Sequence, residues 1–530
     1  MKSLLCLLLV LSSFFAKAQK QHYVDFYEGG QKASEGYFIR GFEQGEWNFW
    51  NESGQLKETA NYYMGQFNGS VIHFHPNGQI KHEGYFLLDK QDSIMRSFSA
   101  DGILLEQGNY VEDLKIGTWE YWKGDGNLWL RENYTDSTFF IDFFRDRDGT
   151  ITLENGKGSM SSYYPSGQVK STCQYKNKSR SGQFSSFFRN GEVKESGVYL
   201  NGLRDGLWTE LWREGGTKKT STYTEGTLNG TFSEYYPDGK LNVQGDFIGG
   251  MKQGTWKWFM PNGQLEIKGD FVKDEQTGEW IYYYGNGKIN SKGDYLKGVK
   301  TGTWEHYYFT GEIWKRGPFS NGLKNGDWAF WFEDGQELMK GSFAKDKEEG
   351  LWKSWYENGN PKDEGYYSKG KLDGKWTGYY PNGVKNYEGT WKGDMRIGKW
   401  AFYYENGKLD EEGTYNNEGE KHGMWEDYNE SGILLSKGSY KNSMPEGKWE
   451  YFFPNGSPQR LQNMKEGMLD GLAITYTRGG KKLQEAEYKM NKRHGKFIVY
   501  NERTGKPDQH LIFENGQVAK VVVANGGGKK

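Results

Sequence analysis

An internal repeat of 24 residues is the feature that most constrains the fold of this chain. A glycine followed two residues later by tryptophan or another apolar residue recurs at this spacing, as at Gly254, Gly278 and Gly302. The same phase runs through most of the 530 residues, with one extra residue before Gly423 and irregular, shortened units near residues 93–157. A repeat of this length is one supersecondary unit, which buries its apolar face by stacking on its neighbours.

Composition indicates which kind of unit repeats. The chain has 75 glycines and 17% aromatic residues, while Leu, Ile and Val are scarce after the first twenty positions. Many glycines and many aromatic rings together favour short strands and tight turns over helices. The shortage of aliphatic residues argues against a thick two-layer core.

Each repeat contains an Asn-Gly or Asp-Gly pair between two short apolar runs, as at Asn262-Gly263. Such a pair predicts a β-hairpin with a two-residue loop, in which both loop residues have φ > 0. This loop predicts four cross-strand pairs, which are Met260 with Leu265, Trp258 with Ile267, Trp256 with Gly269, and Gly254 with Phe271. We therefore expect each tryptophan ring to cover the glycine that faces it, and each aromatic of the second strand to cover the glycine that opens the first.

The predicted fold is all-β, an elongated and twisted single-sheet array of about twenty stacked β-hairpins. We expect a signal peptide over residues 1–18, the repeat array over residues 19–516, and a polar Gly/Lys tail over residues 517–530. The signal peptide is indicated by Lys2, an apolar run too short to span a bilayer, and the sequence Ala16-Lys17-Ala18. Cleavage there leaves Cys173 as the only cysteine, so no disulfide forms within the mature chain.

The repeat resembles a known family. Gly-x-Trp, two aromatics, Asn-Gly and Gly-x-Tyr, as found between Gly374 and Gly398, are similar to the MORN (membrane occupation and recognition nexus) repeat in its bacterial variant form. The resemblance covers roughly residues 21–516. It implies a β-hairpin array, with scaffolding, dimerisation or membrane-lipid association across the wider family, and some bacterial members are labelled antitoxins.

The sequence offers little for catalysis. It has two cysteines and eight histidines, and it lacks the spacing patterns of zinc proteases, serine hydrolases and phosphate-binding loops. We therefore expect no enzyme activity and no cofactor. Lys and Arg number 68 against 70 Asp and Glu, so the charge does not support binding to nucleic acid or to an anionic membrane.

One histidine cluster could hold a metal. His73 and His75 share a predicted strand face, and the register places His82 opposite His73. Three imidazoles on one face suit Zn²⁺ or Cu²⁺. The alternative is chance substitution at variable positions, and we predict no metal site.

Binding specificity is expected at positions that vary from repeat to repeat, because a side chain that changes freely does not hold the fold together. These candidates are Trp258, Tyr282, His306, Phe330 and Phe402. The irregular segment 123–157 is another candidate region. A further aromatic recurs on the opposite face in nearly every repeat, as at Trp331 and Trp355, and its regularity favours packing over binding.

These observations predict an exported, non-catalytic scaffold that binds protein or glycan at the cell envelope, along an extended β-surface. The signal peptide would deliver it to the periplasm, the cell surface or the medium. The alternatives are a membrane-lipid-associated scaffold and, by family label, an antitoxin. Self-association is also compatible with the sequence.

Overall fold

The computed structural model describes residues 19–136 and 138–524. The expected signal peptide, residues 1–18, lies outside the described residues, as do residues 525–530 of the expected tail. The chain divides into two units, residues 1–250 and 251–530, which we describe separately. Within the described part of both units the regular structure is strand alone, and it contains no helix that is long and apolar enough to cross a membrane.

The strands of unit 1 are β1 (Gln21–Phe26), β2 (Lys32–Ile39), β3 (Phe42–Trp50), β4 (Leu56–Tyr63), β5 (Gln66–Phe74), β6 (Ile80–Leu87), β7 (Lys90–Phe98), β8 (Leu104–Val111), β9 (Leu114–Trp122), β10 (Leu128–Tyr134), β11 (Phe139–Arg145), β12 (Ile151–Glu154), β13 (Lys157–Tyr163), β14 (Val169–Lys176), β15 (Ser179–Phe187), β16 (Val193–Leu200), β17 (Leu203–Leu211), β18 (Thr217–Thr224), β19 (Thr227–Tyr235) and β20 (Leu241–Ile248).

The strands of unit 2 are β21 (Met251–Phe259), β22 (Leu265–Val272), β23 (Glu275–Tyr283), β24 (Ile289–Leu296), β25 (Val299–Tyr307), β26 (Ile313–Ser320), β27 (Leu323–Lys324), β28 (Gly326–Trp331), β29 (Glu337–Ala344), β30 (Lys347–Trp355), β31 (Pro361–Ser368), β32 (Lys371–Tyr379), β33 (Lys385–Lys392), β34 (Met395–Tyr403), β35 (Leu409–Tyr415), β36 (Lys421–Tyr428), β37 (Leu434–Lys441), β38 (Met444–Phe452), β39 (Pro458–Lys465), β40 (Met468–Tyr476), β41 (Lys482–Lys489), β42 (Lys492–Tyr500), β43 (Pro507–Glu514) and β44 (Gln517–Ala524).

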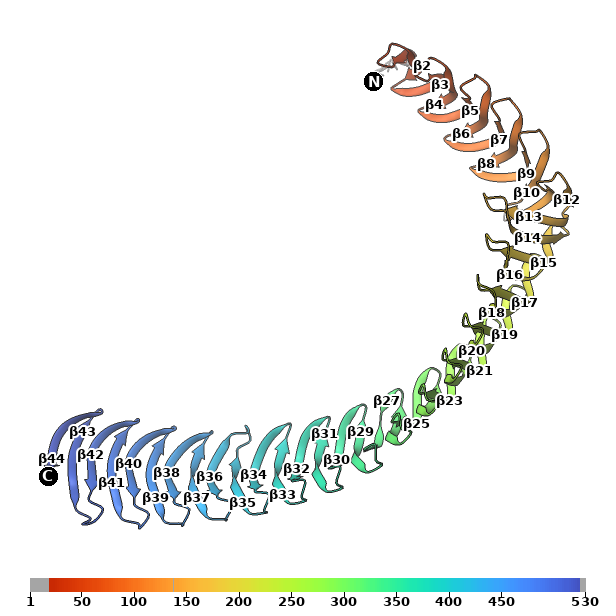
Figure 1. Ribbon diagram of the computed structural model, residues 1–530. Coiled ribbons are helices and arrows are strands. Elements are labelled where there is room, and N and C mark those ends of the chain that lie inside the picture. The colour runs from red at the N-terminus through yellow and green to blue at the C-terminus, as the bar shows by residue number, and fades with distance from the viewer. Residues whose placement is uncertain (1–18, 137, 525–530) are drawn as a thin grey trace, which may run out of the picture. The chain divides into compact units, whose positions relative to one another are not determined.

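Within each unit, consecutive strands lie side by side in chain order and pair antiparallel, with turns along two edges (Figure 1). The exception is β27 and β28, which both pair with β26. The all-β hairpin array is therefore confirmed. The array runs further than we expected, because β44 pairs with β43 beyond residue 516. Residues 517–524 therefore form a strand, and the predicted boundary of the tail at residue 517 is placed too early.

The turn at Asn-Gly differs from the prediction. In the turn Met260–Gln264, only Gly263 has a positive φ, at 87°. The amide of Met260 donates to the carbonyl of Gln264, and the amide of Gly263 donates to that of Met260. This is a three-residue loop that closes with a glycine bulge. Phe259 therefore pairs with Leu265, and the predicted pair of Met260 with Leu265 is wrong.

Asparagine is favoured in this turn by its side chain. The Oδ1 of Asn286 accepts the amide of Lys288 at 3.0 Å, and its Nδ2 donates to the carbonyl of Phe309 in the next hairpin at 2.9 Å. The same two bonds recur at Asn382 and Asn406. The asparagines thus join successive hairpins along this edge.

Turns with two positive φ angles occur at the opposite edge. Lys273 and Asp274 have φ of 51° and 67° between the paired residues Val272 and Glu275, as a type I′ turn requires. The carboxylate of Asp274 accepts the amide of Lys252 from the preceding turn at 2.7 Å. Both edges are therefore joined from one hairpin to the next.

The Gly-x-Trp motif forms a β-bulge. Lys268 pairs with Ile281 and Asp270 with Thr277, so Gly269 stands opposite three residues of β23. Gly278, with a φ of 62°, begins this bulge. Glycine is needed there for its backbone angle.

The predicted pairing of Trp256 with Gly269 is confirmed, but the ring that covers Gly269 is a different one. A β-carbon on Gly269 would lie 2.2 Å from Cδ2 of Trp280, which belongs to the next hairpin. The indole nitrogen of Trp280 also donates to the carbonyl of Asp270, at 3.3 Å, beside the bulge. Tryptophan therefore closes the joint between hairpins, and the expectation that it covers the glycine within its own hairpin is wrong.

The ring of Phe271 does not cover Gly254, contrary to the second expectation. A β-carbon on Gly254 would meet no heavy atom within 4 Å, although Gly254 pairs with Phe271 as predicted. The ring of Phe271 instead packs edge-on against Trp280, with centroids 5.2 Å apart. These tryptophans form the core of the sheet, since Trp256 and Trp304 are 2% and 1% exposed.

The contact between a covered residue of one hairpin and the side chain that covers it from the next hairpin is here called the joint. Other residues than glycine and tryptophan occupy some joints. Where the covered residue is not glycine, the ring that faces it is smaller, as in the neighbouring pairs Ala486 with Phe497 and Ser221 with Phe232. Where the covered residue is Gln462, the residue that faces it is the small Ala473. In these three contacts a larger covered residue therefore goes with a smaller facing side chain.

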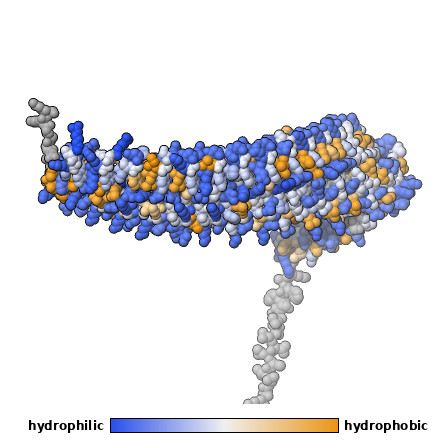
Figure 2. Space-filling view, turned by 90° about the horizontal axis from the view of Figure 1, so that it is seen from below, coloured by the Kyte–Doolittle hydropathy of each residue, from blue (hydrophilic) through white to orange (hydrophobic). Residues whose placement is uncertain are grey.

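The surface is mixed. Apolar residues flank many of the two-residue turns, as Leu296 and Val299 do, and both are exposed. Figure 2 shows one face on which hydrophobic residues form separate patches among hydrophilic ones. We call the face that carries the tryptophans of Gly-x-Trp the Trp face.

Candidate functional site

The predicted binding positions lie in one continuous row on the Trp face of unit 2. Trp258 pairs with Ile267, which pairs on its other side with Tyr282. The row continues in the same way through later strands to Phe402 and Val499. We call it the variable row, and its first section consists of Trp258, Ile267, Tyr282, Ser291, His306, Lys315, Phe330 and Met339.

Aromatic side chains of the variable row lie between the core tryptophans. The ring of Trp258 lies 5.9 Å from Trp256 and 5.8 Å from Trp280, centroid to centroid. Tyr282 lies 6.3 Å from both Trp280 and Trp304. In each of these four pairs the two ring planes are inclined to each other by 33–36°. The rings therefore form an overlapping strip across several strands.

Phe330 and Phe402 occupy equivalent places further along. Phe330 lies 6.1 Å from Trp328, and Phe402 lies 5.8 Å from Trp400. All five predicted residues are half-buried. Each therefore packs against the core and also presents part of its side chain to solvent. The row thus contains residues that lie 24 apart in sequence, from Trp258 to Phe330, and Phe402, which lies 72 residues further on.

A group of cations that we did not predict surrounds His306. Lys315 is its cross-strand partner. The amine of Lys300 lies 3.8 Å from the ring centroid of Trp304, and that of Lys324 lies 4.6 Å from Phe343. Lys300, Lys315 and Lys324 with His306 form what we call the basic cluster.

The charges of the basic cluster are unbalanced. Burial and then the positive charges of Lys315, Lys300 and Lys324 lower the pKa of His306 to about 4. Burial, followed by Lys324 and Lys300, also lowers the pKa of Lys315. Every charged group that perturbs these two side chains is therefore a lysine, and none of the three lysines forms an ion pair within the described residues of unit 2.

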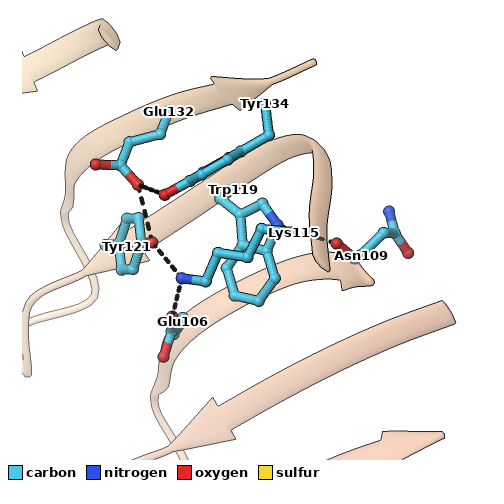
Figure 3. Close-up of polar contacts among 7 residues, drawn as sticks. All are labelled: Glu106, Asn109, Lys115, Trp119, Tyr121, Glu132 and Tyr134. Atoms are coloured by element: carbon cyan, nitrogen blue, oxygen red, sulfur yellow. Dashed lines mark hydrogen bonds and ion pairs between the residues drawn. The ribbon is translucent and has the colours of Figure 1, made fainter. Parts of the chain in front are cut away.

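An equivalent position in unit 1 shows how such a lysine is neutralised elsewhere. Lys115 lies over Trp119 at 3.8 Å, as Lys300 does over Trp304, but its amine also contacts Glu106 at 3.3 Å (Figure 3). The hydroxyl of Tyr121 accepts a bond from Lys115 and donates one to Glu132. In the basic cluster, Ser291 and His306 stand where Glu106 and Tyr121 stand here, so the carboxylate is missing.

Sequence reasoning missed the three lysines because they lie 9 and 15 residues apart. The available signal was the repeat itself, since Lys300 and Lys324 hold the same position in consecutive repeats. In the repeats before and after, that position holds Gln276 and Glu348. The basic cluster is therefore confined to two repeats.

The histidines of unit 1 do not converge on a metal. His73 and His82 pair as predicted, with ring centroids 6.4 Å apart. The Nδ1 of His73 instead contacts Glu58 at 3.2 Å, and the Nε2 of His75 contacts the carbonyl of Phe98 at 2.9 Å. No group of metal-ligating side chains occurs among the described residues. His75 holds a place where other repeats have a tyrosine that bonds to the next hairpin, as Tyr284 does.

The aromatic residues on the opposite face are half-buried. Trp331 and Trp355 lie near cations, with Arg316 at 5.5 Å from one ring centroid and Lys340 at 5.0 Å from the other. Nearby side chains are balanced by acids, such as Lys292 by Glu305 at 3.1 Å. Lys257 and Lys268 face each other across strands on this side, but both are exposed, whereas the three lysines of the basic cluster are half-buried.

Comparison with known proteins identifies the repeat. The MORN repeat variant matches twelve segments, which are residues 43–62, 67–87, 157–177, 228–248, 252–273, 276–297, 300–321, 348–369, 372–392, 396–417, 421–442 and 445–466. Each segment covers about one hairpin of the structure. No curated protein matches the sequence.

Solved structures resemble the chain only remotely. One is the crystal structure of TcdB2-TccC3, at 10% identity and a TM-score of 0.13, covering 94% of this chain and 34% of that chain. Another is a Photorhabdus luminescens Tc holotoxin pore, at 9% identity and a TM-score of 0.12, covering 93% of this chain and 32% of that chain. The chain spans about a third of the length of these structures.

Proposed function

We propose that this chain, which belongs to the MORN repeat variant family, is an exported, non-catalytic scaffold that binds an extended acidic partner along the first section of the variable row, from Trp258 to Met339 in unit 2. The observation that carries the proposal is the basic cluster beside the aromatic strip. Three lysines without a carboxylate partner supply a charge that a ligand can neutralise, and the half-buried rings supply apolar contact area.

The arrangement suits a long ligand better than a small one. The variable row crosses one strand after another, and each strand contributes one side chain to it. A polymer lying across the strands would contact several repeats at once, so weak contacts would add within one complex. An acidic glycan or an acidic protein segment of the cell envelope has this chemistry.

Binding can be tested with defined polymers on the full chain without residues 1–18. Polygalacturonate and polyglutamate are the two acidic probes, and dextran is the neutral control. We expect at least one acidic probe to bind, and we expect affinity to fall as salt is raised, because the lysines are partly exposed to solvent. Binding of dextran as strong as that of both acids would contradict the proposal.

Lysine variants test whether the acidic probe binds at the variable row. We expect K315Q/K324Q to weaken binding of the acidic probe about tenfold, which corresponds to the loss of two charge-assisted contacts. The matched control is K257Q, which removes an exposed lysine from the opposite face of the same unit. If both variants bind like the wild type, the variable row is not the binding surface.

Binding to lipid vesicles distinguishes the main alternative, a membrane-lipid-associated scaffold. The protein is pelleted with neutral vesicles and with vesicles that contain anionic lipid. We expect little pelleting relative to the capture by the acidic polymer. Strong pelleting with anionic vesicles that K315Q/K324Q abolishes would replace the polymer proposal by a membrane-lipid-associated scaffold.

A further inference from the structure

A hollow of about 400 Å³ lies in the irregular segment of unit 1. Its walls come from three successive strand ends and turns, at Lys123, at Arg145 and Arg147, and at Tyr163. Its apolar floor is formed by Trp129, Phe144 and Met160. We propose that this hollow, the irregular-segment pocket, binds an organic acid that joins a carboxylate to a flat apolar ring.

The hollow exists because the repeat is altered here. Met160 stands two residues after Gly158, where a regular repeat has the tryptophan that covers the preceding strand. The strand before it, β12, is only four residues long. Here the indole and the glycine that it covers in other repeats are both missing, since β12 (ITLE) has no glycine and Met160 replaces the tryptophan.

The floor suits a ring. Trp129 and Phe144 meet edge-on, with centroids 6.3 Å apart, and Phe144 is 3% exposed. Met160 packs against the same buried cluster. A planar apolar group can pack against such side chains at little entropic cost, and a thioether adapts its shape to the ligand.

The rim supplies positive charge. Lys123, Arg145 and Arg147 line the hollow. They donate to backbone carbonyls, as Arg145 Nε does to Leu128 at 3.0 Å and Lys123 Nζ does to Asp146 at 3.2 Å. Arg147 lies over the ring of Tyr163 at 4.2 Å. A guanidinium held on a ring in this way keeps donors free for a planar carboxylate.

The nearby carboxylates are already engaged. Asp146 accepts bonds from the hydroxyl of Tyr163 and from the amide of Arg147. Asp148 accepts the amide of Thr150 at 2.9 Å, and this bond lowers its pKa. Neither aspartate lines the hollow. The charge presented to a ligand is therefore positive.

Benzoate and its neutral isostere benzamide test the pocket. Ligand-observed NMR on the full chain without residues 1–18 should detect benzoate with a dissociation constant of about 1 mM or tighter, a strength within reach of a ligand of this size. Benzamide should bind at least several-fold more weakly. Equal binding of both, or no detectable benzoate binding at 10 times that concentration (about 10 mM), would overturn the proposal.

Three variants locate the binding. R147Q removes a cation from the rim and should weaken benzoate binding at least fivefold. R189Q removes an arginine that lies over Tyr164, outside the lining, and should bind like the wild type. M160W restores the tryptophan of the regular repeat and should abolish binding by filling the hollow. Unchanged binding in R147Q and in folded M160W would place benzoate elsewhere and refute the assignment.

Discussion

The indole ring of Trp280 lies on Gly269 of the preceding hairpin, so close that a β-carbon on the glycine would stand 2.2 Å from the ring. The same relationship joins Trp304 to Gly293 and Trp328 to Gly317. Hairpins are therefore held together by a ring from one and a bare backbone from the next. Four predictions about this fold follow from specific contacts.

Substituting Gly269 by alanine should destabilise unit 2. The new β-carbon cannot coexist with Trp280 as placed, so the ring or the strand must shift, at a cost of about 1–3 kcal/mol in the free energy of unfolding. Urea denaturation measures this. The control is G285A, where the nearest atom to the new β-carbon would be Met260 Sδ at 3.8 Å. If both variants lose equal stability, the ring contact is not the cause.

Substituting Asn286 should weaken the Asn-Gly edge. N286A removes a bond to the carbonyl of Phe309 and another from the amide of Lys288, so we expect a loss of about 1–2 kcal/mol. N286D keeps the acceptor for Lys288 and loses the donor to Phe309, so it should lose less. Thermal unfolding compares the three proteins. A loss in N286D as large as in N286A would assign the whole effect to the bond between hairpins.

Substituting Lys273 by asparagine should stabilise the chain. Lys273 has a φ of 51°, a conformation that asparagine adopts more readily than lysine does. We expect a gain of up to about 1 kcal/mol in the free energy of unfolding. K268N, in the adjacent strand, should have the opposite sign, since asparagine disfavours strands. Chemical denaturation of both variants tests the sign.

Stability should fall in mild acid because of His306. Its pKa in the folded chain is lowered to about 4, whereas an unfolded histidine titrates near 6.5. Between those values the unfolded state takes up a proton that the folded state does not, so the contribution of His306 is complete above about pH 6.5 and is lost as the pH falls toward 4. Glutamine does not titrate, so the stability of the wild type relative to H306Q should decrease over this range. A constant difference between pH 7 and pH 4.5 would contradict the lowered pKa.

The sequence predicted the repeat, the strands and most of the register, because the 24-residue period and the alternation of residues fix which side chains share a face. Trp256 therefore pairs with Gly269 as expected. The turns could not be assigned so easily, since Asn-Gly suits both a two-residue loop and a three-residue loop with a bulge. The structure has the three-residue loop both at Asn262, whose Nδ2 donates to Gln264 in the same turn, and at Asn286, whose Nδ2 donates to the next hairpin.

The glycine on which each tryptophan packs could not be predicted from the sequence either. Pairing within a hairpin can be counted from the turn, but the bulge at Gly278 shifts the ring onto the strand before it. The five predicted binding positions fall in one row because the 24-residue period places equivalent residues on the same face. The basic cluster was not, because its charges come together across two hairpins and are unremarkable in the composition.

The repeated packing of a tryptophan on a glycine of the preceding hairpin makes the order of the hairpins partly interchangeable. From β22 to β38 every such contact joins a glycine to the tryptophan of the next hairpin, so this contact alone does not fix which of these hairpins follows which. Gln462 instead faces Ala473, Ala486 faces Phe497, and Ser221 faces Phe232. A hairpin that carries one of these residues is matched to its own successor, whereas the hairpins between β22 and β38 share one common fit.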